Sequence, residues 1–386
     1  MTARARGRRI AAALIIIVTA YVVWLGVNIV RFNPPRAVSP TAARAGGPPY
    51  EVVGVYHVHT KFSDGRATPE EITAVAAGRK LDFVILTDHG NPNQRSLGSQ
   101  GWKEGVLMLA GSELSVSRGH LVALDFATPE RPFPQNAELA VQEVAAGGGF
   151  SVVAHPYSKT SWTWGEEAGF SGIEIADSDS MVKRNYLRFL PYLPALAFKP
   201  VLPLLEALSR PVETLRKWDS LAAQQPVFGY FSSDAHFFYS AVFGCFRLHA
   251  LLEEPLAQDF ERARGQVFGA LRRGRFYSAV DGAAPAGGFE FWAEAGGERF
   301  PMGSRIRWDG ASTVTLDVRA PFTFDVETRL VRDGEVVERA RRAELSYAAD
   351  KPGVYRVEVY LRRRSPLAAD FPWIVSNPIF LKRSWP

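Results

Sequence analysis

The chain has 386 residues, of which 47% are hydrophobic, so it can bury the cores of two or three domains. Its single cysteine, Cys245, excludes an intrachain disulfide and a thiolate metal site, so any metal must be held by His, Asp and Glu. The net charge of +5 comes from the first 50 residues, which hold seven arginines and no acid, whereas the rest carries 38 Lys and Arg against 40 Asp and Glu. Because this nearly neutral body lacks a basic stripe, we expect no nucleic-acid scaffold binding.

The first element that the sequence predicts is a transmembrane anchor at residues 10–30. These 21 residues carry no charge, and as a helix they would span the hydrocarbon core of a bilayer. Four arginines in residues 1–9 predict a cytoplasmic tail, a single pass through the inner (cytoplasmic) membrane and an extracytoplasmic body. Two alternatives stay open: a cleaved signal peptide, since residues 43–45 have the small-x-small form, and a buried helix of a soluble fold.

Residues 31–49, rich in proline, alanine and glycine, are expected to form a linker. Beyond them, apolar strand runs alternate with helical patterns up to residue 284. The predicted strands are EVVGVYHVH, DFVILTDH, VLMLAGSEL, FSVVAHP, SGIEIAD and PVFGYFSSDAH. Residues 68–81 predict a helix, because Thr68, Pro69 and the acids that follow are typical of a helix start. The alternation indicates an α/β fold with parallel strands buried on both faces.

Residues 181–225 interrupt this alternation. The stretch FLPYLPALAFKPVLPLLEAL is apolar, but its four prolines and two charges make it too broken for a second transmembrane helix. Two interpretations stay open. The segment is either a helical insertion that packs on the rest of the domain or a surface that rests on the membrane beside the anchor.

Residues 288–386 have an all-β pattern. Segments such as STVTLDVRA, TRLVRDGEVVERA and GVYRVEVYL alternate with period two, and Asp333-Gly334 predicts a hairpin turn. We therefore expect a small β-sandwich. It contains no histidine, so its expected role is packing against the preceding domain or binding a partner.

The stretch HVHTKFSDG places His57 and His59 two residues apart, with Asp64 in a turn that follows. On a strand, residues i and i+2 share a face, so both imidazoles can reach one ion. Five other candidate ligands also lie at or just past the ends of predicted strands. They are His89, Glu113, His155, Asp234 and His236, and His120 in RGHL is a further candidate. In parallel α/β folds, sites assemble at this edge.

Each of these residues alone could be a capping acid or a hydrogen-bonded core histidine. Together they would be expensive to bury without pairing or a bound ion, on the order of several kcal/mol. Imidazole with carboxylate suits Zn, Mn or Fe(II) better than Mg or Ca, and nine ligands suffice for two or three ions. His249, in the apolar FRLHALL, is instead expected to be structural, and Asp88 is expected to orient its neighbours rather than bind metal.

The motifs HVHTKFSDG, LTDH, GSE, GH, AHP and SDAH, in this order, resemble those of the PHP (polymerase and histidinol phosphatase) superfamily. The resemblance covers residues 51–284 and implies a distorted (β/α)7 barrel, at residues 50–284, with a two- or three-metal site. It implies one ion held by His57, His59, Glu113 and Asp234. Glu113 would bridge to a second ion on His120 and His155, and Asp64, His89 and His236 would hold a third. Asp64 stands where many relatives have a histidine. The anchor, the C-terminal domain and the ending PWIVSNPIFL resemble the carbaryl-hydrolase-like branch.

The resemblance implies a membrane-anchored hydrolase that cleaves phosphate mono- or diesters of small molecules with a metal-activated hydroxide. Glu113, Asp234 and Asp64 are the expected catalytic residues. Arg66, Arg118 and Lys159 lie near the motifs and are candidates to grip a phosphate, with solvated surface charge as the alternative. Two other functions stay open: a carbamate, ester or amide hydrolase using the same site, and a non-catalytic envelope binding protein. The complete ligand set argues against the last.

Overall fold

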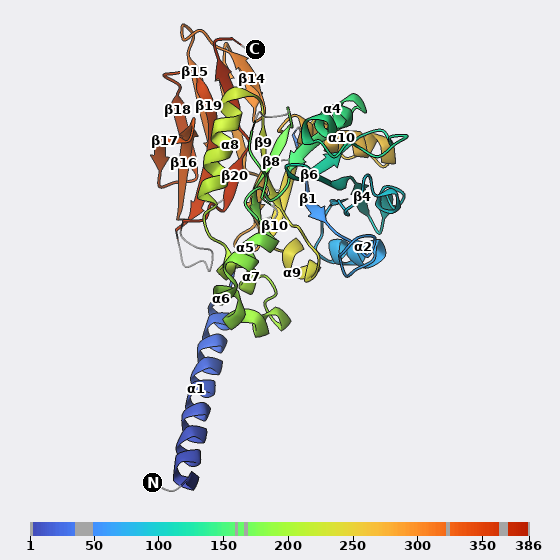
Figure 1. Cartoon of the computed structure of the whole chain (residues 1–386). Helices are drawn as coiled ribbons and strands as arrows, with labels where there is room; N and C mark the ends of the chain where they lie inside the picture. The colour runs from blue at the N-terminus through green and yellow to red at the C-terminus, as the bar shows by residue number, and fades with distance from the viewer. Residues whose placement is uncertain are drawn as a thin grey trace.

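The computed structural model describes residues 3–34, 49–158, 161–165, 169–321, 325–362 and 370–384. Figure 1 shows a mixed α/β body from which one long helix, α1 (Ala3–Arg31), projects. In the described part of the chain, α1 is the one helix long and apolar enough to cross a membrane. Its large apolar side chains from Ile10 to Val18 are exposed, and the side chains that the body covers lie from Tyr21 onward.

Two groups of strands close around a common core in the first half of the body. The first group contains β1 (Tyr50–Val58), β2 (Phe83–Leu86) and β4 (Val106–Ala110), which run parallel, with β3 (Gly101–Lys103) on the edge. The second group is, in order, β5 (Ser112–Val116), β6 (Gly119–Leu124), β7 (Phe150–Val153), β8 (Gly172–Asp177) and β9 (Phe228–Ser232). Backbone hydrogen bonds join the groups at both ends, from Gly111 N to Leu86 O (2.8 Å) and from Ser233 N to Tyr56 O (3.0 Å).

The expectation of parallel strands is wrong for β6, which runs antiparallel to both β5 and β7. Only Ser117 and Arg118 connect β5 to β6, and so short a connection can join only antiparallel strands. The expected single strand VLMLAGSEL is also broken at Gly111, between β4 and β5. A Cβ atom at Gly111 would clash with the carbonyl oxygen of Ala123, so a glycine lets the chain pass from one group of strands to the other.

Helices lie on the outer side of these strands (Figure 1). They are α2 (Pro69–Gly78), α3 (Gln94–Leu97), α4 (Ala137–Ala146), α9 (Tyr239–Phe243) and α10 (Phe260–Arg272). The predicted start of α2 is observed as a capping box: Glu71 N donates to Thr68 Oγ1 (3.3 Å) and Thr68 N donates to Glu71 Oε2 (2.7 Å).

The C-terminal strands continue the sheet of the first half. Next to β1 lies β10 (Phe246–Leu252), then β11 (Phe276–Val280), β20 (Ile374–Ser376), β19 (Gly353–Leu361), β21 (Ile379–Lys382) and β14 (Arg305–Arg307). Strand β16 (Val326–Arg332) also pairs with β19, and β17 (Glu335–Ala340) pairs with β16. A separate sheet contains β13 (Glu298–Pro301), β12 (Glu290–Ala295), β15 (Val314–Arg319) and β18 (Glu344–Ala348). Asn377 accepts from Gly229 N (2.8 Å) and donates to Phe276 O (3.0 Å), which ties the chain's last residues to β9 and β11.

The segment between β8 and β9 is helical, as predicted for the insertion. It contains α5 (Ser178–Arg184), α6 (Tyr186–Phe189), the 3₁₀ helix η2 (Leu190–Ala197), α7 (Leu202–Ala207) and α8 (Val212–Gln224). A buried ion network joins α8 to β19. Arg356 donates to both carboxylate oxygens of Asp219 (2.9 Å each) and to Glu358, which also accepts from Arg210 (2.9 Å). These charges are stabilised in the interior because each has an opposite partner.

Replacing Arg356 with methionine should therefore destabilise the protein. Removing one partner of a buried ion pair costs roughly 3–5 kcal/mol, because the other charge stays buried. We expect the apparent melting temperature of the full-length protein in detergent to fall by several degrees. Arg341→Met, at an exposed position of the same half of the chain, is the matched control and should have no effect. Equal melting temperatures for the two variants would contradict the proposed role of the network.

Candidate metal centre

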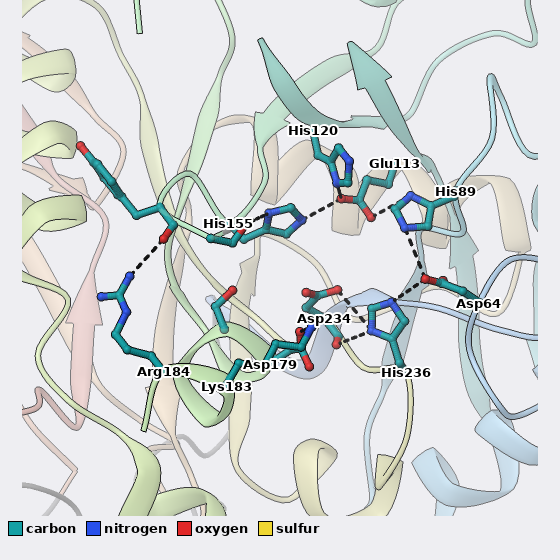
Figure 2. Close-up of a pocket in the computed structure, with 13 residues that line it drawn as sticks. Asp64, His89, Glu113, His120, His155, Asp179, Lys183, Arg184, Asp234 and His236 are labelled. Atoms are coloured by element: carbon teal, nitrogen blue, oxygen red, sulfur yellow. Dashed lines mark hydrogen bonds and ion pairs between the residues drawn. The ribbon is translucent and has the colours of Figure 1, made fainter. Parts of the chain in front are cut away.

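Glu113 lies at the centre of a cluster of six histidines and three acidic residues. Figure 2 shows the members of this cluster that line a cavity. Its side chain is buried in β5, and its two oxygens face different neighbours. Oε1 lies 2.7 Å from His120 Nδ1 and 2.9 Å from His155 Nε2. Oε2 lies 3.1 Å from both His57 Nε2 and His59 Nε2. Glu113 belongs to two of the possible ion sites and could contribute to holding an ion in each.

The first possible ion site contains His57, His59, Glu113 and Asp234. His57 Nε2 and His59 Nε2 lie 3.1 Å apart, and Asp234 Oδ1 lies 3.5 and 3.3 Å from them. Four ligands at about 2.0–2.1 Å around a tetrahedral ion lie about 3.3 Å from one another. The observed separations match that spacing, so these four side chains fit a metal ion such as Zn²⁺.

Two further groups lie beside the first. One contains His89, Glu113 and His120. The other contains His59, Asp64, His89 and His236. Within the second of these, Asp64 Oδ2 lies 3.2 Å from His236 Nε2 and 3.7 Å from His89 Nε2. His89 Nδ1 is buried without a hydrogen-bond partner, which is expected of a nitrogen that binds a metal. His89 thus belongs to both of these groups, whereas the motif resemblance implied that it holds only the ion bound by Asp64 and His236.

Three ligand residues have an unusual backbone. His57, His155 and Asp234 have φ values of +67°, +24° and +40°. Non-glycine residues in this region cost on the order of 1–3 kcal/mol each and often occur at active sites. At His57 the pairing of β1 with β2 shifts register, so β1 is bulged there. His57 and His59 both reach the cluster, but through this bulge rather than through the regular alternation of a strand.

Asp88 and Glu174 hold the ligands in place. As predicted, Asp88 is outside the ligand groups, and it accepts hydrogen bonds from Thr60 N (2.6 Å) and Ser63 Oγ (2.6 Å) in the loop that leads to Asp64. Glu174, on β8, was not expected. It accepts from His57 Nδ1 (2.6 Å), which leaves the lone pair of His57 Nε2 directed at the ion site. A single acid inside the apolar run GIEIAD was the signal in the sequence.

The cluster favours positive charge. Burial alone would lower the pKa of His57, but the charges of Glu174 and Glu113 raise it well above its ordinary value. Hydrogen bonds with Asp234 and Glu113 likewise outweigh burial and raise the pKa of His59 to about 9. The charge of His57 lowers the pKa of Glu113 and of Asp234, although burial opposes this. Without metal, protons supply the positive charge, and a divalent ion would replace them.

A cavity of about 510 Å³ opens over the cluster. Its opposite wall comes from α5 in the insertion, which contributes Asp179, Ser180, Lys183 and Arg184 (Figure 2). Lys183 pairs with Asp179, and Arg184 donates to Tyr157 O (3.0 Å). The cavity thus has metal ligands on one side and two cations on the other. These two cations were not among the residues predicted from the sequence, because they lie outside the motifs along the chain.

The residues expected to grip a phosphate are placed differently. Arg118 donates to Glu138 Oε1 (2.5 Å) and Thr163 O (3.0 Å) and does not line the cavity. Arg66 is exposed and is also absent from the cavity wall. Lys159 lies outside the described residues. His249 lies between Glu51 (2.8 Å) and Asp281 (3.1 Å), apart from the cluster, in the structural role expected for it.

No protein-family model matches the chain. An uncharacterized protein of Methanocaldococcus jannaschii is 26% identical over 161 residues, covering 37% of this chain and 94% of that protein. A solved two-domain protein of Bacteroides vulgatus, described as containing a predicted PHP-like metal-dependent phosphoesterase, has a TM-score of 0.45 and 16% identity over 87% of this chain and 97% of its own. An amidohydrolase of Chromobacterium violaceum with bound sulfate and no metal has a TM-score of 0.31 and 18% identity, over 47% and 87%. The candidate metal centre therefore rests on this chain's own residues.

Metal binding should strengthen as the pH rises. With a pKa of about 9, His59 is protonated in the metal-free protein at neutral pH, and that proton must leave before an ion binds. The stabilisation that His59 gives the metal-free fold is complete below about pH 6.5 and is lost as the pH rises towards 9. We expect the Mn²⁺ affinity to rise about tenfold per pH unit for each displaced proton between about pH 6.5 and 9. Calorimetric titration in buffers of different ionisation enthalpy would measure this, and a flat profile without proton release would contradict it.

Glu174→Gln should weaken metal binding, because it removes the carboxylate that orients His57. Loss of such a partner typically lowers metal affinity about 10- to 100-fold. Competition with a metal-sensitive dye would measure the affinity, and Glu335→Gln, at an exposed position, is the control. An affinity equal to that of the control would mean that Glu174 does not position His57 for the ion.

Proposed function

We propose that the protein is a metal-dependent hydrolase of the PHP type that cleaves phosphate mono- or diesters. The observation that carries this proposal is the cavity itself. Three groups of candidate metal ligands, linked through Glu113, His59 and His89, face Lys183 and Arg184 across about 510 Å³. A phosphoester needs positive charge on both sides, because its oxygens carry the negative charge of the ground state and of the transition state.

When bound, divalent ions would supply a water molecule of lowered pKa and would offset charge on the phosphoryl oxygens. The protein's own residues do the positioning. Glu113 keeps the ligand groups adjacent, Glu174 holds His57, and Asp88 holds the loop that carries Asp64. Lys183, held by Asp179, extends from the facing wall and can bind a phosphate oxygen that no ion contacts.

The finer features of the architecture also belong to this proposal. Residues 50–284 would form the distorted seven-stranded barrel of the PHP family, and residues 288–386 a β-sandwich. We propose that α1 crosses the inner membrane with residues 1–9 in the cytoplasm and the catalytic domain outside it. The exposed apolar surface of α1 and the arginines before it support this orientation.

The proposal predicts chelator-sensitive cleavage of p-nitrophenyl phosphate or bis-p-nitrophenyl phosphate by the full-length protein in detergent, with two or three ions bound per chain. Lys183→Gln should lower kcat/KM about 10- to 100-fold, because it removes a charge-assisted hydrogen bond to the phosphate. Its metal content should stay unchanged, since Lys183 is not a ligand. Lys351→Gln, at an exposed position, is the matched control.

Three results would count against this function. Bound metal with no P–O cleavage, but with turnover of a carbamate, ester or amide, would assign the site to that class of hydrolase. Bound metal with no hydrolysis at all would favour a binding protein. A folded protein that takes up no metal would overturn the assignment of the site.

A further inference from the structure

The insertion is a physical link between the metal cavity and the long helix α1. Its first helix, α5, ends at Arg184 in the cavity wall, and α6 begins two residues later at Tyr186. The next element, η2, packs on α1: Tyr21 Oη donates to Pro191 O (2.8 Å), and the rings of Trp24 and Tyr192 lie 4.9 Å apart. Figure 1 shows α6 beside the end of α1 and α5 directly above it.

This contact is at the end of α1 where a membrane–water boundary is expected. Tyr21 and Trp24 are aromatic residues of the kind that gather at that boundary. Leu25 on the same part of α1, and Phe32 just past its end, are buried against the body, whereas Ile15 and Ile16 are exposed. The insertion therefore lies at the level where α1 would leave the bilayer.

The insertion carries an apolar face that the described protein leaves uncovered. Leu187, Leu190 and Leu193 are 69%, 49% and 39% exposed. Leu190 and Leu193 are three residues apart in the 3₁₀ helix η2 and so lie one above the other, and Leu187 precedes them in α6. Tyr186 and Phe198 are also exposed, the latter by 73%. Soluble surfaces rarely expose so many large apolar side chains together, so this face has a partner.

The charges around this face suit an anionic lipid surface. Residues 180–205 contain four cations and no acid. Lys183, Arg184 and Arg188 are exposed. The Nζ of Lys199 lies 6.0 Å from the ring centroid of Phe32, the residue that follows α1. An apolar face bordered by Lys and Arg is the pattern of segments that lie in the membrane interface.

A second apolar element lies on the metal side of the insertion. Phe237 and Phe238 follow the ligand His236 directly and are 44% and 45% exposed. Together with Phe189 of α6 they line a small hollow that also touches Asp234. The cavity is thus bordered by apolar groups on the same side of the molecule as the insertion, which suits a substrate with an apolar part.

We infer that residues 186–198 are seated in the interface of the bilayer that α1 crosses, and that the metal cavity acts on phosphoesters of membrane lipids. This inference rests on the proposed phosphoesterase function and names its class of substrate. In the reaction, the oxygen of water forms a bond to phosphorus and the bond from phosphorus to the alcohol oxygen breaks. One proton of the water goes to that alcohol oxygen, and the other product is a phosphate or a phosphate monoester.

The seating is tested with the full-length protein in vesicles of phosphatidylcholine and phosphatidylglycerol. Because the native Cys245 is buried, a fluorophore can be attached selectively after Leu187→Cys. Nitroxide-labelled lipids should quench this label at least about twofold more than a label at Glu335→Cys, which is exposed on β17. Equal quenching at the two positions would overturn the seating.

The substrate class is tested by comparing lipid and soluble esters. The double variant Leu187→Asp, Phe198→Asp alters two exposed side chains outside the cavity. It should lower the turnover of phosphatidic acid or phosphatidylglycerol in vesicles about tenfold or more, because charge opposes interfacial seating. Turnover of the p-nitrophenyl esters should change less than about twofold, since the cavity is intact.

The possible outcomes distinguish a failure of the lipid inference from a failure of the proposed phosphoesterase function. Cleavage of soluble esters without any cleavage of lipid esters would overturn the lipid substrate and leave the phosphoesterase intact. Equal loss on both substrates would show that the variant damages the cavity rather than its seating, and would also overturn the inference. Deep quenching with no cleavage of either ester would overturn both the phosphoesterase and its lipid substrate, and leave the seating alone supported.

Discussion

The arrangement of the first half of the molecule depends on one buried carboxylate. Glu113 has almost no contact with solvent, and histidines from four different segments converge on its two oxygens. A lone buried carboxylate would be expelled or protonated, so it requires this shell of donors or ions. The strained backbone at His57 and Asp234 is tolerated for the same reason, because the surrounding hydrogen bonds hold the ligands in place.

That many of the candidate ligands lie close together could be predicted from the sequence. Histidines after apolar strand runs converge whenever parallel strands end at one edge, so the order of motifs sufficed for His59, His89 or Asp234. The role of Glu174 could not be read in this way, because an acid within a strand gives no sign of which side chain it faces. Likewise, Lys183 and Arg184 reach the cavity only because the insertion folds back over it, and that is a tertiary contact without a local pattern.

In the fold, too, the local features could be predicted from the sequence and the features that depend on distant contacts could not. The helix at α2 and the hairpin strands of the C-terminal half follow from capping residues and period-two patterns, which are local. The reversal of β6 and the continuity of the sheet from β1 to β20 depend on pairing between distant residues. Register between such strands is set by the packed core as a whole, so no short segment reveals it.

The pairing of the chain's last strands with β11, and of Asn377 with β9, also constrains how the molecule is made. Strand β9 leads directly to Asp234, so the segment that completes the cluster is held partly by a residue 148 positions further along the chain. Ribosomes deliver the chain from its N-terminus, and the ring of strands must wait for its far end. The cluster is therefore completed only when strands that are distant in the sequence have paired, so its assembly is coupled to the folding of the whole body.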